Sequence, residues 1–288
     1  MAQERWTVQR VIQWTTEHFQ KKGLDNPRLE AEVLLAYLLE MDRMGLYLNY
    51  DRPLKEEERT AYREMIQRRL AKEPLAYIVG SKEFWSLCFA VNPECLIPRP
   101  ETEHLVEEAV RIGKGLKPPL RVLEIGQGCG AVAIALATEL GEAQIVAIDI
   151  SAGACSLAQA NAERHGVTGR IRFVVGDLFP RGEGPFGLIC SNPPYIPTAE
   201  IPALAPEVRD YEPLTSLDGG EDGLRFFRRI AQGASALLVA GGWLLLEMGQ
   251  GQAPQVAAIL QEQGFAQIDL IPDLAGVKRV IKAQWLGQ

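Results

Sequence analysis

The apolar residues at the start of the chain recur at the spacing of one helix face. After Thr7, a candidate N-cap, they are Val8, Val11, Ile12 and Phe19. Asn26 and Pro27 are a cap and an N1 proline that open a second helical stretch. Because no alternating β pattern interrupts these stretches or the next one at 55–72, the sequence predicts a small all-helical domain at residues 1–80. The basic residues of the 55–72 stretch are mixed with glutamates, which favours a solvated helix face: Arg59, Arg63, Arg68, Arg69 and Lys72.

A β-rich stretch and a proline-punctuated loop follow this helical region. Residues 84–91 read FWSLCFAV, and residues 92–100 contain three prolines. The sequence therefore predicts a β-rich linker at 81–100. Pro100 then opens a helix, with Glu101 and Glu103 near its positive end.

From residue 120 onward, apolar strands alternate with helical stretches. Strands are expected at 121–126, 144–149, 170–177, 186–192 and 241–249, with helices at 131–140, 153–166, 222–239 and 253–263. Such alternation is typical of a doubly wound α/β fold with a mostly parallel sheet. The last two strands, 267–271 and 277–284, are too close together for a helical crossover, so we expect them to pair antiparallel. This region, 101–288, is the predicted catalytic domain.

Composition and charge narrow the class of protein. Of the 288 residues, 47% are hydrophobic and 23% charged, as in an ordinary soluble globular chain. The net charge of −7 argues against nucleic acid as the default partner. The five cysteines and three histidines lack metal-ligand spacing, so we expect reduced thiols and no metal site. With no secretory signal or membrane-length apolar run, we expect a cytoplasmic protein without a membrane partner.

A glycine-rich turn joins the first strand of the α/β region to its first helix. Gly126, Gly128 and Gly130 allow a sharp turn and a close backbone approach to a ligand. Asp149 ends the next strand, where an acid can bind two ribose hydroxyls, so we predict a nucleoside-containing ligand. Together with Ala131, the turn fits the dinucleotide pattern G-x-G-x-x-A. Glu124 and the third glycine favour instead the E-x-G-x-G-x-G pattern of class I S-adenosylmethionine-dependent methyltransferases, with Gln127 and Cys129 between the glycines.

A second acidic turn, Gly176 to Phe179, follows the third strand. In such methyltransferases, an acid or its neighbour at this place often contacts the adenine, which makes Asp177 and Leu178 candidate cofactor-binding residues. An ordinary turn acid at the end of a strand is the alternative interpretation.

The tetrapeptide Asn192-Pro193-Pro194-Tyr195 ends the fourth strand. Two consecutive prolines cannot donate backbone hydrogen bonds and fix a rigid extended turn. A planar NH2 group can then donate one hydrogen to the Asn192 side-chain oxygen and one to the Pro193 carbonyl, while Tyr195 packs against its flat face. Because the lone pair of an amide or aromatic amine is delocalised, such a clamp favours methyl transfer to that nitrogen without a strong base.

The chain resembles the release factor glutamine methyltransferases over nearly its whole length. The resemblance rests on the segments EPLAYIVGSKEFWSLCFAV, LIPRPETEHLVEEAV, VLEIGQGCGAVAIALA, AIDIS, NPPYIP and EPLTSLDGGEDGLRFFRRI. It implies a helical domain that recognises the protein substrate, joined to a class I methyltransferase domain. The implied reaction uses S-adenosyl-L-methionine to methylate the glutamine side-chain amide in the Gly-Gly-Gln motif of class 1 peptide-chain release factors. We expect the enzyme to be a monomer.

Functional roles known for the family are assigned here only to positions that match the family's motifs. It implies cofactor binding by the glycine turn and Asp149, with a further contact from Asn192, and a substrate clamp at 192–195. Family members commonly have threonines where Gln127 and Cys129 stand, which puts any hydroxyl contact with the cofactor in doubt. Residues 98–101 are expected to border the active site by resemblance, with a purely structural linker as the alternative. Gly276 and Arg279 receive no catalytic role.

Three other functions remain open at this point. An adenine-N6 methyltransferase acting on DNA or RNA would use a similar clamp, but it usually presents a basic surface. An NAD-dependent oxidoreductase would explain the glycine turn and leave residues 192–195 unused. A non-enzymatic binding module would keep the cofactor pocket and transfer no methyl group.

Overall fold

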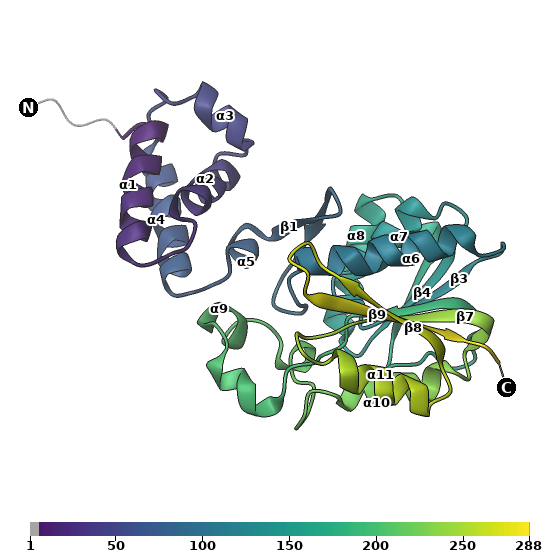
Figure 1. The fold of residues 1–288 in the computed structure, drawn as a ribbon. Coiled ribbons are helices and arrows are strands. Elements are labelled where there is room, and N and C mark those ends of the chain that lie inside the picture. The colour runs from purple at the N-terminus through teal and green to yellow at the C-terminus, as the bar shows by residue number, and fades with distance from the viewer. Residues whose placement is uncertain (1–5, 288) are drawn as a thin grey trace, which may run out of the picture. The chain divides into compact units, whose positions relative to one another are not determined.

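The computed structural model describes residues 6–287, and the chain divides into two units. The first comprises residues up to Gly80 together with Pro206–Tyr211. The second comprises Ser81–Ala205 and the chain from Glu212 onward. Figure 1 shows the helices of the first unit and the sheet of the second.

The first unit is all-helical, as the periodicity predicts. Its helices are α1 (Val8–Lys21), α2 (Pro27–Leu38), α3 (Arg43–Leu48), α4 (Glu56–Leu70), α5 (Leu75–Val79) and the short α9 (Pro206–Arg209). The predicted N-cap at Thr7 is confirmed, since its hydroxyl accepts a hydrogen bond from the Arg10 backbone at 3.4 Å. Asn26 is at the N-cap of α2, but its side chain makes no capping bond.

One basic side chain of α4 turns inward, where a solvated face was expected. Arg69 is 4% exposed and pairs with Glu30 of α2 at 2.6 Å. It also lies 3.0 Å from Glu207 of α9. The buried guanidinium is stable there because it is paired and hydrogen-bonded, as a buried charge requires.

The second unit begins with a hairpin and is built around one twisted sheet. Strands β1 (Ser81–Phe84) and β2 (Leu87–Ala90) pair antiparallel. The seven-stranded sheet has the order β5-β4-β3-β6-β7-β9-β8. Its members are β3 (Arg121–Ile125), β4 (Gln144–Asp149), β5 (Ile171–Val175), β6 (Phe186–Ser191), β7 (Leu238–Glu247), β8 (Ala266–Pro272) and β9 (Lys278–Trp285).

The strand directions confirm the predicted α/β class. Strands β5, β4, β3, β6 and β7 are parallel, and β9 is antiparallel to both β7 and β8. The antiparallel pairing expected for the last two strands is therefore confirmed. Because the strand order reverses between β3 and β6, their carboxyl ends form the crevice where doubly wound folds bind ligands.

Helices cover both faces of the sheet (Figure 1). One face carries α6 (Glu103–Gly115), α7 (Ala131–Glu139) and α8 (Ala152–Arg164), and the other carries α10 (Arg225–Ala234) and α11 (Ala253–Glu262). The first seven residues of α7 are all buried, because the sequence AVAIALATE is apolar on every side. No helix within residues 6–287 is long and apolar enough to cross a membrane.

Candidate active site

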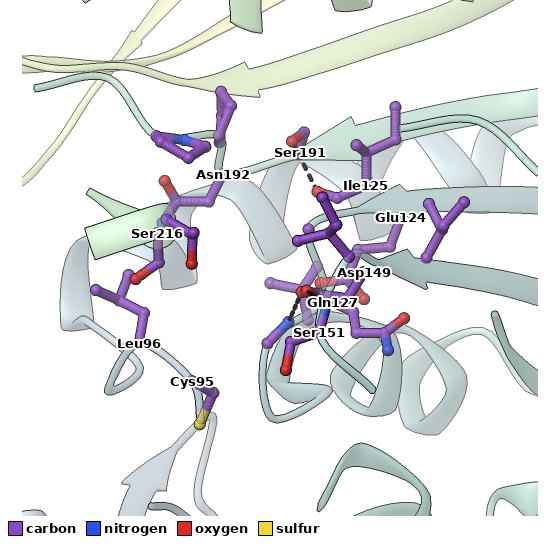
Figure 2. Close-up of a pocket in the computed structure, with 18 of the residues that line it drawn as sticks. Cys95, Leu96, Glu124, Ile125, Gln127, Asp149, Ser151, Ser191, Asn192 and Ser216 are labelled. Atoms are coloured by element: carbon purple, nitrogen blue, oxygen red, sulfur yellow. Dashed lines mark hydrogen bonds between the residues drawn. The ribbon is translucent and has the colours of Figure 1, made fainter. Parts of the chain in front are cut away.

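A cavity of about 440 Å³ lies at the carboxyl ends of β3, β4 and β6. Figure 2 shows residues from these strand ends on one side and Cys95 and Leu96 of the 92–100 loop on another. Across residues 6–287, no group of three or more His, Cys, Asp or Glu side chains is arranged to hold a metal ion.

The glycine turn forms one wall of the cavity. The Gly126 amide donates to the Ile148 carbonyl of β4 at 2.8 Å, which fixes the turn against the neighbouring strand. Gly126, Gly128, Gln127 and Cys129 line the cavity, whereas Gly130 does not. Gly130 has φ +83°, and a Cβ there would lie 3.0 Å from the Cβ of Ala158. The third glycine is therefore needed for the close packing of α7 against α8.

Asp149 holds the glycine turn as well as facing the cavity. Its Oδ2 accepts from the Gly128 amide at 3.0 Å, and its Oδ1 accepts from the Ser151 amide at 2.9 Å. Each carboxylate oxygen can accept more than one hydrogen bond, so both remain able to meet a ribose hydroxyl. The two backbone bonds fix the direction of the carboxylate before any ligand arrives.

Glu124 is buried beneath the turn and borders the cavity. Burial raises the pKa of Glu124 to about 8, and the charge of Asp149 adds to the shift. Within residues 6–287, its Oε2 atom has no hydrogen-bond partner. A buried polar atom of this kind is costly unless a ligand satisfies it, so this side chain is available for a hydrogen bond with a ligand.

Gln127 and Cys129, the two residues that depart from the family pattern, carry an amide and a thiol and have no hydroxyl group. Gln127 is 4% exposed, and its Nε2 lies 3.0 Å from the sulfur of Cys155. The Cys129 and Cys95 thiols interact, which lowers the pKa of Cys95 and raises the pKa of Cys129 well above its usual range.

Asp177 and Leu178 border the cavity, and their contact with the adenine remains a prediction. Asp177 is paired with Arg229 of α10 at 2.7 Å, at an exposed site. Leu178 has φ +62°, an uncommon conformation for a branched residue. Strained backbone of this kind is concentrated at functional sites, which is consistent with a ligand-contacting turn.

Asn192, Pro193 and Pro194 line the cavity across from the glycine turn. The Nδ2 of Asn192 donates to the Thr102 hydroxyl at 3.1 Å. One residue earlier, the Ser191 hydroxyl donates to the Ile125 carbonyl at 2.7 Å, which ties the end of β6 to β3 (Figure 2). With its NH2 group held by Thr102, Asn192 keeps its Oδ1 as an acceptor for a ligand.

Tyr195 does not line the cavity; it packs against the hydrophobic core of the sheet. Its carbonyl accepts from Gln252 at 2.9 Å. Burial raises the pKa of Tyr195 to about 12, and the nearby Glu247 carboxyl adds to the shift. The expected packing of Tyr195 against a substrate amide thus remains a prediction.

Residues 98–101 were expected to border the active site by resemblance, and the cavity lining includes two of them. Pro98 and Arg99 line the cavity, while Pro100 and Glu101 do not. Arg99 pairs with Glu212 at 2.5 Å, which joins two segments more than 100 positions apart. The signal available in the sequence was that both segments belong to the stretches that carry the family resemblance.

Two further residues adjoin Asn192. Thr102 is in the 3₁₀ turn Pro100–Thr102, and Glu247 ends β7. An acid at the end of a buried parallel strand, at the same sheet edge as Asn192, was a usable sequence signal for Glu247.

The strand order, with a glycine turn after β3, an acid after β4 and the Asn-Pro-Pro turn after β6, defines this chain as a class I methyltransferase.

The comparisons with known proteins agree with this class and narrow it. Residues 10–80 match the family model described as the PrmC N-terminal domain, and residues 122–211 match one described as a methyltransferase domain. A release factor glutamine methyltransferase from Geobacter sulfurreducens is 48% identical over 279 residues, covering 96% of each chain. One from Rhodopirellula baltica is 41% identical over 289 residues, covering 97% of this chain and 96% of that one. This chain therefore belongs to the release factor glutamine methyltransferase family.

A solved structure supports the fold independently. The crystal structure of a methyltransferase from Pyrococcus furiosus matches with a TM-score of 0.53 at 20% identity. The match covers 77% of this chain and 98% of that one. At this level of identity, the likeness concerns the fold alone.

Proposed function

We propose that this chain methylates the side-chain amide nitrogen of the glutamine in the Gly-Gly-Gln motif of class 1 peptide-chain release factors, with S-adenosyl-L-methionine as methyl donor. The observation that carries the proposal is the Asn192 amide at the cavity wall, with its NH2 group bound to Thr102 and its oxygen left as an acceptor. The methyl-accepting amide brings two N–H donors, so it needs acceptors here. The enzyme acts as a monomer in the cytoplasm, in translation termination.

The cavity residues fit this cofactor. Asp149 presents a fixed carboxylate at the place where a ribose is bound in this fold. Glu124 lines the cavity, and its buried Oε2 is left for a hydrogen bond with a ligand. Leu178 and Asp177 border the part of the cavity assigned to the adenine.

Methyl transfer to an amide nitrogen depends more on aligning that nitrogen with the methyl group than on a strong base. When bound near Asp149 and the glycine turn, the cofactor would supply an activated methyl group to the amide nitrogen, which would release one proton in exchange. Asn192 Oδ1 and the Pro193 carbonyl each accept one N–H of the substrate amide, which orients the nitrogen lone pair toward the methyl group. The prolines keep that carbonyl in place because they lack backbone donors and restrict rotation. The proposal also assigns Tyr195 to the flat face of the substrate amide, a contact that requires its ring to reach the cavity from its place against the sheet core.

The two parts of the chain divide the work. Residues 1–80 recognise the release factor, the β-rich segment 81–100 connects the parts, and residues 101–288 carry out methyl transfer. Nucleic acid and membrane are not partners in this proposal.

The proposal is tested by incubating purified enzyme, S-adenosyl-L-methionine and a class 1 release factor, followed by mass spectrometry of the release-factor peptides. We expect the mass of one CH2 group to be added at the Gly-Gly-Gln glutamine. DNA and RNA are incubated in parallel with radiolabelled cofactor. Label in nucleic acid and none in the release factor would replace the proposal with an adenine-N6 methyltransferase.

The role of Asn192 is tested with Asn192→Ala. We expect methyl transfer to fall at least about 100-fold, while the Kd for the cofactor changes little, because one of two acceptors for the reacting amide is lost. Calorimetric titration with the cofactor is the matched measurement. An Asn192→Ala enzyme with full activity would show that the clamp assignment is wrong.

A further inference from the structure

An asparagine can present either of two chemically opposite groups to a substrate. Its amide has an oxygen that accepts and an NH2 group that donates, and the two ends have nearly the same shape. The substrate amide assigned under Proposed function offers only donors at its nitrogen. The Asn192 amide must therefore be held with its oxygen toward the cavity, and something in the protein must exclude the flipped orientation.

Thr102 alone cannot set this orientation. Its hydroxyl lies 3.1 Å from Asn192 Nδ2, and it is buried. A hydroxyl can accept from the NH2 group, but it can equally donate to the oxygen of a flipped amide. The direction of the bond depends on where the hydrogen of Thr102 goes.

Glu247 is placed to take that hydrogen. In the parallel register of β6 and β7, Ser191 is beside Leu246, so Asn192 and Glu247 follow at the same level of adjacent strands. Glu247 is 2% exposed, and within residues 6–287 its Oε2 has no hydrogen-bond partner. Burial raises the pKa of Glu247, and hydrogen bonding from the Thr102 and Asn192 side chains opposes that rise.

We propose that Glu247 is a positioning residue that, by accepting the Thr102 hydroxyl hydrogen, holds Asn192 with its oxygen toward the methyl-accepting nitrogen. A carboxylate only accepts hydrogen bonds. Once the Thr102 hydrogen is directed to Glu247, the Thr102 oxygen can only accept, and it selects the NH2 end of Asn192. This inference rests on the proposed function, and it gives the turn Pro100–Thr102 a role through Thr102.

Protonation of Glu247 would reverse the direction of these bonds. Burial raises the pKa of Glu247 to about 7, opposed by Thr102 and Asn192. The charged groups around it are Glu101, which raises the pKa, and Arg279 of β9, which lowers it; the Tyr195 ring is also near. A protonated carboxyl can donate to Thr102, which frees that hydroxyl to donate to a flipped Asn192. Activity should therefore fall as pH is lowered through about 7.

The test compares Glu247→Gln with the wild type and with Glu108→Gln. The glutamine has the same shape, but its NH2 group can donate to Thr102. We expect kcat of Glu247→Gln to fall about 10- to 100-fold, as for residues that orient a reacting group. The cofactor Kd should not rise and the melting temperature should not fall. The decrease in activity below about pH 7 should disappear. Glu108 is also buried beside the sheet, but it pairs with Arg111 and Lys282, so Glu108→Gln should keep the wild-type kcat and pH profile.

A second pair of variants tests whether Glu247 acts through Thr102. Thr102→Ser keeps the hydroxyl and should retain most of the activity, whereas Thr102→Val should lose as much as Glu247→Gln. The double variant Glu247→Gln/Thr102→Val should lose no more than either single change, because both break the same chain of bonds.

Each outcome decides one question. A Glu247→Gln enzyme with the wild-type kcat and pH profile overturns the inference. A Glu247→Gln enzyme that loses cofactor affinity and stability along with kcat also overturns it, because that result indicates a merely structural role. Multiplicative losses in the double variant also overturn it. A wild-type enzyme that leaves the release factor unmethylated contradicts the proposed function itself.

Discussion

The buried carboxyl of Glu124 should make the protein less stable as pH rises. Burial raises the pKa of Glu124 to about 8, so the folded protein binds a proton there that the unfolded chain releases near pH 4.5. Its contribution to stability is complete below the unfolded pKa and is lost as pH rises through the folded pKa. At one pKa unit per 1.36 kcal/mol, the loss amounts to about 1 kcal/mol at pH 5 and about 3 kcal/mol at pH 7.

Glu124→Gln removes this titration. Burying the amide of Glu124→Gln has a desolvation cost of its own that does not vary with pH. The informative quantity is therefore how the stability difference between Glu124→Gln and the wild type changes with pH. Between about pH 5 and about pH 7, the free energy of unfolding of Glu124→Gln should gain roughly 2–3 kcal/mol relative to the wild type. Urea unfolding of both proteins without cofactor, followed by tryptophan fluorescence, measures this difference.

Glu108→Gln is the matched control with the opposite sign. Burial opposes ionisation of Glu108, but hydrogen bonds from Arg111 and Lys282 outweigh it and hold the pKa below its usual range. Its stabilising contribution is therefore complete above the unfolded pKa and is lost only as pH falls through the folded pKa. Glu108→Gln should be destabilised at neutral pH, by an amount that stays constant down to about pH 5. A stability difference for Glu124→Gln that is the same at both pH values would refute the reasoning.

Two further variants test the geometry of the site. Asp149→Asn replaces one carboxylate oxygen with an NH2 group that must face the amide of Gly128 or Ser151, so the cofactor Kd should rise about 10- to 100-fold in calorimetry. Gly223→Ala places a Cβ 2.4 Å from the Tyr195 carbonyl at a residue with φ +72°, so the melting temperature and kcat should both fall, at a cost of about 1–3 kcal/mol in unfolding. Unchanged cofactor affinity in the first, or unchanged thermal unfolding in the second, contradicts the corresponding contact.

The sequence predicted the parts of the site that depend on local pattern. Strand–turn–helix alternation placed the glycine turn after β3 and the acid Asp149 after β4, and the short gap before β9 indicated an antiparallel pair. Each of these features lies within one or two neighbouring elements. Hydrophobic period and turn chemistry determine such features directly.

The parts that were missed depend on register and on tertiary packing. Thr102 and Glu247 meet Asn192 only because β6 and β7 are adjacent in a given register and the turn before α6 reaches them. The glycine spacing could not show that Gly130 serves helix packing, because a packing glycine and a ligand-contacting glycine look the same in a pattern. Helical periodicity placed Arg69 with the charged residues of α4, and only its partner Glu30 on α2 explains its burial.

The place of β9 inside the sheet has a consequence for how the protein is made. β9 follows every other strand in the chain, yet it lies between β7 and β8 and is the strand to which β8 is paired. During synthesis, β7 therefore presents an unpaired apolar edge until residues 278–285 have left the ribosome. Because Glu247 at the end of β7 pairs with Val280, the edge that supports Asn192 is completed in the same step. A nascent chain should thus acquire its methyl-transfer activity abruptly, once residues 278–285 have been added.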